Sequence, residues 1–98
     1  MEITYKNSKL QKVCKNFSEA DKRYGKDMAE KILLRINQIE ASSTVEMMIQ
    51  YRIGRCHRLK GNRENQYAVD LVHPNRLIFE KIGEHIQIAK VTEIVDYH

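Results

Sequence analysis

The spacing of apolar residues changes once along the chain, from a helical period to strict alternation. A first stripe of apolar residues has the spacing of one face of a helix and consists of Leu10, Val13, Cys14 and Phe17. Asn7 or Ser8 precedes this stripe and is suited to cap a helix. A second stripe runs over Met28–Ile39. It predicts a longer helix that starts at the capping-box-like sequence at Ser18 and ends near Ala41.

After Gly54 the apolar residues alternate with polar ones, which is typical of strands that bury one side. The alternation predicts strands at Arg55–Leu59, Tyr67–Leu71, Leu77–Phe79 and His85–Tyr97, in addition to a short one at Met1–Tyr5. A slip between Ile88 and Val91 suggests a bulge. The order of elements predicts an α+β domain, in which an antiparallel sheet of four to five strands packs against two N-terminal helices.

The length of the chain sets the scale of this domain. Residues 1–98 fit a single domain, because chains divide only well above this size. The sequence contains no run of 18 apolar residues, and its first residues lack the apolar core of a signal peptide. We therefore expect a cytoplasmic protein without a membrane partner.

Cysteine and histidine show no metal-ligand pattern. Cys14 and Cys56 are not spaced as in C-x-x-C, and the four histidines lack a spacing such as H-x-x-x-H. We expect neither a metal nor another cofactor. Cys14 falls on the apolar stripe, so its predicted role is core packing.

Positive charge is concentrated in one segment. The net charge is +4, and Met47–Arg63 contains no aspartate or glutamate. Its cationic and histidine residues are Arg52, Arg55, His57, Arg58, Lys60 and Arg63. A solvated edge strand would also carry such charge. The absence of a compensating acid favours a surface that faces anions, with Arg55, Arg58 and Arg63 as RNA-binding candidates.

Four short motifs in the second half carry a family resemblance. They are H-x-L-K-G-N at 57–62, Y-A-V-D-L at 67–71, R-L-I-F-E at 76–80 and V-D-Y-H at 95–98. In this combination the chain resembles the HigB toxins of the RelE/ParE superfamily. The family often has G-N-W where this chain has His73-Pro74-Asn75, so the turn that positions Arg76 departs from the family pattern.

The resemblance implies a RelE-like fold and a ribosome-dependent, metal-independent mRNA endonuclease of a type II toxin–antitoxin pair. It also implies a helix-turn-helix antitoxin of the HigA kind, and contact with DNA only through that antitoxin. The residues that match the family's active site are His57, Lys60, Arg76, Tyr97 and His98.

These residue types suit metal-free RNA cleavage, in which the 2′-OH attacks the adjacent phosphate. Histidine can act as an acid or a base near neutral pH, which suits His98. Arg76 offers a fork to phosphate oxygens, Lys60 fits either role, and Tyr97 can stack on a base. Taken singly, each residue could be ordinary surface charge or a frayed end. The alternatives are a ParE-like, non-enzymatic inhibitor of DNA gyrase and an RNA-binding module without catalysis. The combination of His98 with Lys60 and Arg76 favours the endoribonuclease.

Overall fold

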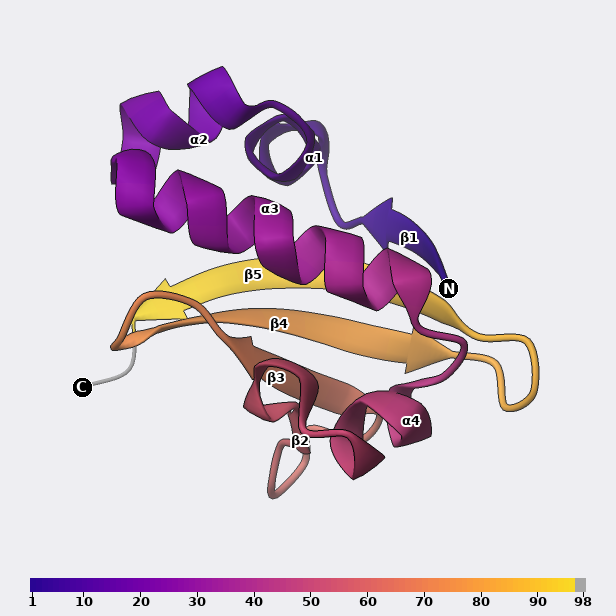
Figure 1. Cartoon of the computed structure of the whole chain (residues 1–98). Helices are drawn as coiled ribbons and strands as arrows, with labels where there is room; N and C mark the ends of the chain where they lie inside the picture. Colours follow the sequence, from indigo (N-terminus) through magenta and orange to yellow (C-terminus); the bar gives the residue numbers. More distant parts are fainter. Residues whose placement is uncertain (97–98) are drawn as a thin grey trace.

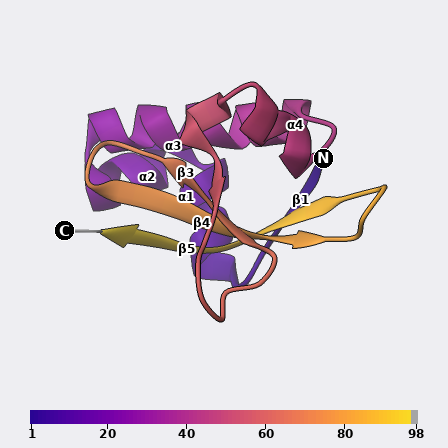
Figure 2. The ribbon, with the colours of Figure 1, turned by 90° about the horizontal axis from the view of Figure 1, so that it is seen from below.

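A five-stranded sheet with helices packed on one side forms the molecule, as the computed structural model of residues 1–96 shows (Figure 1). The strands follow the spatial order β1 (Glu2–Tyr5), β5 (Ile88–Asp96), β4 (Asn75–Ile82), β3 (Gln66–Asp70) and β2 (His57–Arg58). The helices are α1 (Ser8–Lys15), α2 (Phe17–Tyr24), α3 (Lys26–Ala41), α4 (Val45–Gln50) and the 3-10 turn η1 (Ile53–Arg55). Seen from below, α3 and α4 lie on the same side of the sheet (Figure 2). The predicted α+β class is confirmed. Within residues 1–96, no helix is both long and apolar enough to cross a membrane.

The N-terminal layer has three helices where the sequence predicted two. Asn7 caps α1 as expected, because its side chain accepts a hydrogen bond from the backbone N–H of Leu10 at 2.9 Å. The predicted start of the second helix at Ser18 is wrong, since Asn16 caps α2. Gly25 then separates α2 from α3 with a φ of 89°. Only glycine adopts that angle without strain, so the single helix predicted from Ser18 to Ala41 is divided into α2 and α3.

The sheet confirms the predicted strands with three changes. β2 to β5 form an antiparallel meander, while β1 pairs in parallel with β5 at the edge. The predicted strand at Arg55–Leu59 shortens to β2, because Arg55 belongs to η1. The last strand starts at Ile88 rather than His85. The expected bulge is present but one residue further on: Ile78 pairs with Glu93 and Phe79 with Val91, so Thr92 is the extra residue.

Alternation along the strands separates a core side from an outer side. The buried residues that face the helices are Tyr67, Val69, Leu77, Phe79, Ala89 and Val91. The rings of Tyr67 and Phe79 meet edge to face at 5.9 Å, as expected for core residues. Cys14 and Cys56 are also buried, which raises the pKa of each thiol to about 12. Both therefore stay protonated at neutral pH, and the predicted packing role of Cys14 is confirmed.

A polar network, in which Lys81 and Gln87 are buried and Glu46 is exposed, fastens α4 to the β4–β5 hairpin. The Lys81 ammonium lies 3.1 Å from a Glu46 carboxylate oxygen, and Gln87 donates to the other oxygen at 2.8 Å. Gln87 also accepts a hydrogen bond from the backbone N–H of Val45 at 2.8 Å. These hydrogen bonds, from Gln87 first and Lys81 second, lower the pKa of Glu46 below its ordinary value of 4.5. Removing Lys81 or Gln87 would leave one oxygen of the Glu46 carboxylate without its hydrogen-bond donor.

We predict that this network makes stability depend on pH. The pKa of Glu46 is lower in the folded state, so its carboxylate stabilises the fold above pH 4.5. This contribution is lost as the pH falls through the lowered value. Urea unfolding followed by circular dichroism should show Glu46→Gln less stable than wild type at pH 7, with the gap narrowing towards pH 3. Glu64→Gln, which removes an exposed loop carboxylate, is the control. A constant gap between pH 7 and pH 3 would contradict the network's role.

Candidate functional site

Asp70 is the centre of a cluster of arginines at the end of β3. The β3–β4 register pairs Asp70 with Arg76, whose Nε lies 3.4 Å from the Asp70 carboxylate. The Nε of Arg55, in η1, lies 3.3 Å from the other carboxylate oxygen. One carboxylate therefore holds two guanidinium groups from different elements. The Arg55 side chain is 79% exposed, so solvent or an anion can reach it.

A third arginine fixes the backbone of this cluster from the helical layer. The Nε of Arg35, in α3, donates to the carbonyl oxygen of Asp70 at 2.6 Å, and its Nη1 donates to Gln38 at 2.9 Å. Arg35 also lies directly against Gly54, where a Cβ would be 2.9 Å from the arginine Nε. The flanking residues Arg52 and Arg55 have left-handed φ angles of 55° and 53°. Such angles cost energy in non-glycine residues and occur where the surroundings impose them. Here the turn brings Arg55 to Asp70.

A small cleft adjoins the cluster at the β3–β4 turn. It has a volume of about 170 Å³ and is lined by Arg55, Asp70, Leu71, His73, Pro74, Asn75 and Arg76. The turn is closed by hydrogen bonds from Asn75 to the carbonyl of Val72. The final residue described, Asp96, pairs with Asn75, so β5 ends at the same edge as the turn (Figures 1 and 2). The candidate residues Tyr97 and His98 lie outside the described residues.

His57 lies on the outer side of the sheet, as Arg76 does. It pairs with Ala68, which is two residues before Asp70 and therefore on the same side of β3. The His57 Nδ1 lies 3.0 Å from the carbonyl oxygen of Arg55. A carbonyl only accepts hydrogen bonds, so Nδ1 carries the proton and a neutral ring keeps its lone pair on Nε2. This contact favours the tautomer in which Nε2 is available as a general base.

The other candidates divide between this site and its surroundings. Lys60 is exposed in the loop between β2 and β3 and does not line the cleft beside Arg76. Arg58 pairs with the core residue Tyr67, so alternation directs it to the opposite side from His57. Neighbouring residues of a strand face opposite ways. Arg58 is exposed on the side away from His57, and its RNA-binding role stays a prediction. Arg63 returns to the sheet, where its Nη2 lies 2.6 Å from Glu93 and its Nε donates to Gln66 at 3.0 Å.

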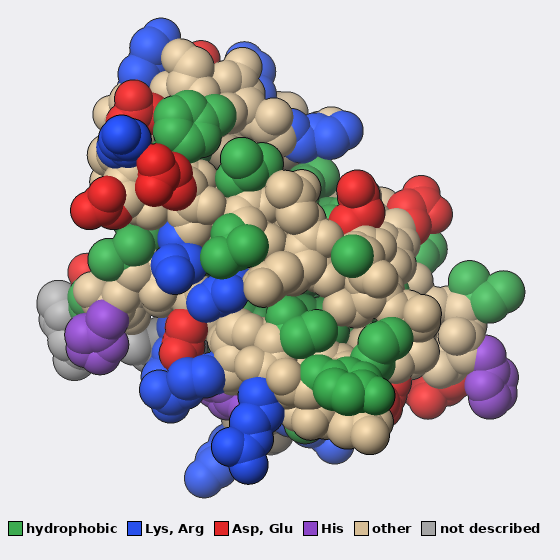
Figure 3. Space-filling view, in the orientation of Figure 1, with side chains coloured by type: hydrophobic (Ala, Val, Ile, Leu, Met, Phe, Trp, Pro, Cys, Tyr) green, Lys and Arg blue, Asp and Glu red, His purple; other side chains and the backbone are tan. Residues whose placement is uncertain are grey.

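The expected acid-free surface also needs correction. Met47–Arg63 contains no acid in sequence, but the fold brings Asp70 against Arg55 and Glu93 against Arg63. Figure 3 shows basic and acidic side chains intermixed at the lower left of the molecule, below α3. The site is therefore an array of partly compensated charges. This arrangement orients guanidinium groups and lowers their mutual repulsion.

Two toxins are among the solved structures that resemble this one. A YoeB/ParE toxin from Agrobacterium tumefaciens is 16% identical, with a TM-score of 0.60 and 100% of both chains covered. The YoeB dimer from Staphylococcus aureus is 19% identical, with a TM-score of 0.55 over 100% of this chain and 97% of that one. The chain has the fold of the YoeB/ParE toxins. No protein-family model and no curated protein sequence matches the chain. The HigB branch stays a prediction, as do the roles of the site residues.

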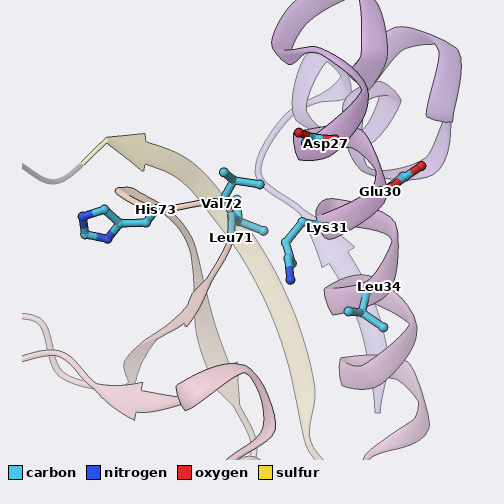
Figure 4. A pocket seen from close by; sticks show the side chains of 7 residues that line it. All are labelled: Asp27, Glu30, Lys31, Leu34, Leu71, Val72 and His73. Carbon is cyan, nitrogen blue, oxygen red and sulfur yellow. The ribbon is translucent and has the colours of Figure 1, made fainter.

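A wider groove borders the site on the side of α3. It has a volume of about 560 Å³ and lies between α3 and the segment Leu71–His73 (Figure 4). Leu34, Leu71 and Val72 give it an apolar floor, and Asp27 and Glu30 lie towards the start of α3 (Figure 4). His73 lines both the groove and the cleft beside Arg76. The groove therefore leads to the arginine cluster.

Sequence reasoning missed the residues that organise the cluster. Asp70 lies within the Y-A-V-D-L motif but was assigned no role, although a charged residue ending an apolar strand is a usable signal. Arg35 resembled the solvated charges of its helix, and nothing local distinguishes it from them. Its contact with Asp70 joins residues 35 positions apart. Only the packing of α3 against η1 reveals it.

We predict that two constraints require glycine at position 54. One is its left-handed backbone angle, and the other is the close contact with Arg35. Gly61 has a φ of 78°, and a Cβ placed there would meet nothing within 4 Å, so Gly61→Ala should cost only backbone strain, about 1 kcal/mol. Gly54→Ala, at a φ of 59°, should cost at least about 1 kcal/mol more, because Arg35 can move away from the new Cβ only by giving up its hydrogen bonds to Asp70 and Gln38. Urea unfolding measures both values. In an Arg35→Ala background the excess for Gly54→Ala should disappear. Equal costs for the two single variants would refute this role of the contact.

Proposed function

We propose that this protein is the toxin of a type II toxin–antitoxin pair and cleaves mRNA on the ribosome without a metal ion. The observation that carries the proposal is the cluster of Arg55, Asp70 and Arg76 beside His57. It combines oriented guanidinium groups with a titratable ring on the fold of the YoeB/ParE toxins. This set of groups suits a reaction that develops negative charge on a phosphate. The motif resemblance to HigB toxins supports the same activity.

The proposed reaction uses the nucleophile that RNA carries. A base takes the proton of the 2′-OH, and the 2′-oxygen then bonds to the adjacent phosphorus. The bond from phosphorus to the 5′-oxygen breaks, and an acid protonates the departing 5′-oxygen. The products are a 2′,3′-cyclic phosphate and a free 5′-OH. Guanidinium groups stabilise the extra charge on the phosphoryl oxygens between these steps.

Each candidate residue has a proposed part in this reaction. Arg76 binds the scissile phosphate, and Arg55 extends the cationic edge at the mouth of the cleft. His57 Nε2 is suited to accept the 2′-OH proton, because Nδ1 is already committed to the Arg55 carbonyl. His98 supplies the second acid–base group, and Tyr97 stacks on a neighbouring base. Lys60 contributes to either proton transfer or phosphate binding from its loop.

The partner implied by this activity is an inhibitor. A free enzyme of this kind would arrest its own host, so we propose a cognate helix-turn-helix antitoxin like HigA. Contact with DNA would be made by that antitoxin. The ribosome would present the mRNA substrate.

The second candidate function is inhibition of DNA gyrase by binding alone. One of the structural neighbours is described as a YoeB/ParE toxin, and the fold by itself does not separate the two activities. Pulsed expression in cells distinguishes them. An endoribonuclease stops translation first and produces mRNA 5′ ends in register with codons, whereas a gyrase inhibitor damages DNA first.

We predict that His98→Ala abolishes growth arrest and leaves the fold intact. Loss of general acid or base catalysis should lower mRNA cleavage in a translation extract by about 10²–10⁴. His85→Ala, which alters an exposed histidine of the β4–β5 hairpin, is the control and should cleave normally. Full toxicity of His98→Ala at equal protein abundance would remove His98 from the active site.

We predict that Arg76 contributes through its planar fork. Arg76→Ala should raise the barrier to cleavage by about 2.7–4 kcal/mol, and Arg76→Lys should lose less, because it keeps the charge without the fork. Lys90→Ala removes a cation from β5 outside the arginine cluster and should have little effect. Single-turnover cleavage of ribosome-bound mRNA measures all three variants. Wild-type rates for both Arg76 variants would exclude the residue from phosphate binding.

A further inference from the structure

A second concentration of positive charge lies on the helical layer, away from the arginine cluster. Residues 3–18 contain four lysines and no aspartate or glutamate. Lys9 and Lys12 of α1 converge with Lys22 and Arg23 of α2 on a groove of about 320 Å³, which also contains Val13 and Glu19. We name this the α1–α2 groove. It lies at the top of Figure 1, at the opposite end of the molecule from η1 and β2.

The charges of the α1–α2 groove are not compensated as those of the sheet are. Among residues 1–96, no ion pair joins Lys9, Lys12 or Lys22 to an acid. All three side chains are exposed, and Figure 3 shows basic side chains over α1 and α2 at the top of the molecule. Like charges that share a groove reinforce one another's potential and attract a polyanion.

A recess with an aromatic wall adjoins the groove. It has a volume of about 150 Å³ and shares Lys9, Val13 and Arg23 with the α1–α2 groove. Its other lining residues are Asn7, Leu10, Tyr24 and Thr92. The Arg23 guanidinium lies over the Tyr24 ring, 5.7 Å from its centre, so this cation covers one face of the ring. An aromatic ring beside a line of cations is the arrangement that binds single-stranded nucleic acid, with phosphates on the cations and a base on the ring.

We propose that the α1–α2 groove and the Tyr24 recess bind single-stranded RNA at a surface separate from the cleft at Arg76. The proposal extends the proposed function, on which it rests for the choice of RNA as the polyanion. The floor of the groove argues against a protein segment as the occupant. Val13 is 8% exposed, so the groove offers a partner helix little apolar area to bury. A phosphate backbone needs only the cations. The exposed large apolar side chains of helices α1 to α3 are Phe17 at the start of α2 and Leu33 and Leu34 of α3, and none of them lines the groove.

The test uses the full chain and a fluorescein-labelled, fully 2′-O-methylated single-stranded RNA, which cannot be cleaved through its 2′ position. Fluorescence anisotropy over a series of KCl concentrations gives Kd and its salt dependence. The groove variant carries Lys9→Gln, Lys12→Gln and Lys22→Gln. The matched control carries Lys15→Gln, Lys26→Gln and Lys31→Gln, which lose the same charge from helices α1 and α3 without lining the groove. Circular dichroism checks that both remain folded.

The groove variant should bind RNA at least tenfold more weakly than wild type, and the slope of log Kd against log[KCl] should fall by about 2, since each lost phosphate contact removes roughly 0.7. The control should bind within threefold of wild type. Tyr24→Leu should weaken binding at least fivefold, and Tyr24→Phe, which keeps the ring, should restore it. Equal losses in the groove variant and the control would overturn the inference, because general charge would then explain binding.

A measurement of mRNA cleavage separates this inference from the proposed function, and a competition experiment tests the choice of RNA as the occupant. Wild-type protein that binds the modified RNA through the groove but fails to cleave mRNA on ribosomes would refute the endoribonuclease and leave the groove's role in place. Normal cleavage of mRNA, together with RNA binding that the groove variant does not weaken, would refute the role of the groove and leave the endoribonuclease in place. A poly-glutamate peptide that competes with RNA at equal charge concentration would assign the groove to an acidic protein segment and overturn the RNA assignment.

Discussion

The contact of three arginines with Asp70 is the interaction on which the candidate site depends. Arg55 and Arg76 hold the carboxylate, and Arg35 donates to the main-chain carbonyl of the same residue. Three guanidinium groups would repel one another without an acid between them, and the repulsion is stronger near a protein surface than in bulk water. Asp70 therefore allows cations from α3, η1 and β4 to occupy one edge of the sheet. The groups are oriented before any substrate arrives, which is the condition for stabilising a transition state efficiently.

The two basic surfaces of the molecule differ in how their charge is balanced. On the sheet, acids from β3 and β5 accompany Arg55, Arg63 and Arg76, so the field is local and the geometry is fixed. On α1 and α2, flexible lysines surround a groove without ion pairs among the described residues. Paired arginines suit a defined phosphate position. Unpaired lysines suit a mobile polyanion whose contacts need no fixed geometry, and their effect is sensitive to salt. The net charge of +4 is thus distributed over two surfaces of different character.

Similarity of fold limits what can be carried over from known toxins. At 16% and 19% identity, the likeness to the two toxins shows a shared fold. It does not transfer an activity, because function depends on the side chains of the site. The proposed RNA cleavage is therefore supported by the chemistry of His57, Arg55 and Arg76 together with the motif resemblance. The polar network of Glu46, Lys81 and Gln87 contributes to stability and has no part in that chemistry.

The sequence by itself determined the elements whose cause is local. Alternation identified the strands and placed the bulge in β5 to within one residue, and capping chemistry narrowed the start of α1 to Asn7 or Ser8. Each of these features depends on neighbours within a few residues. The motifs also selected Arg76 and His57, which share one side of the sheet. Tertiary structure decided the rest. It divided the long helix at Gly25, turned Arg58 away from His57, and supplied Asp70 and Glu93 to a segment with no acids of its own. It also brought Arg35 to Asp70 across 35 residues. Charge compensation and long-range hydrogen bonds depend on distances in space, and these are set by strand register and helix packing rather than by any local pattern of residues.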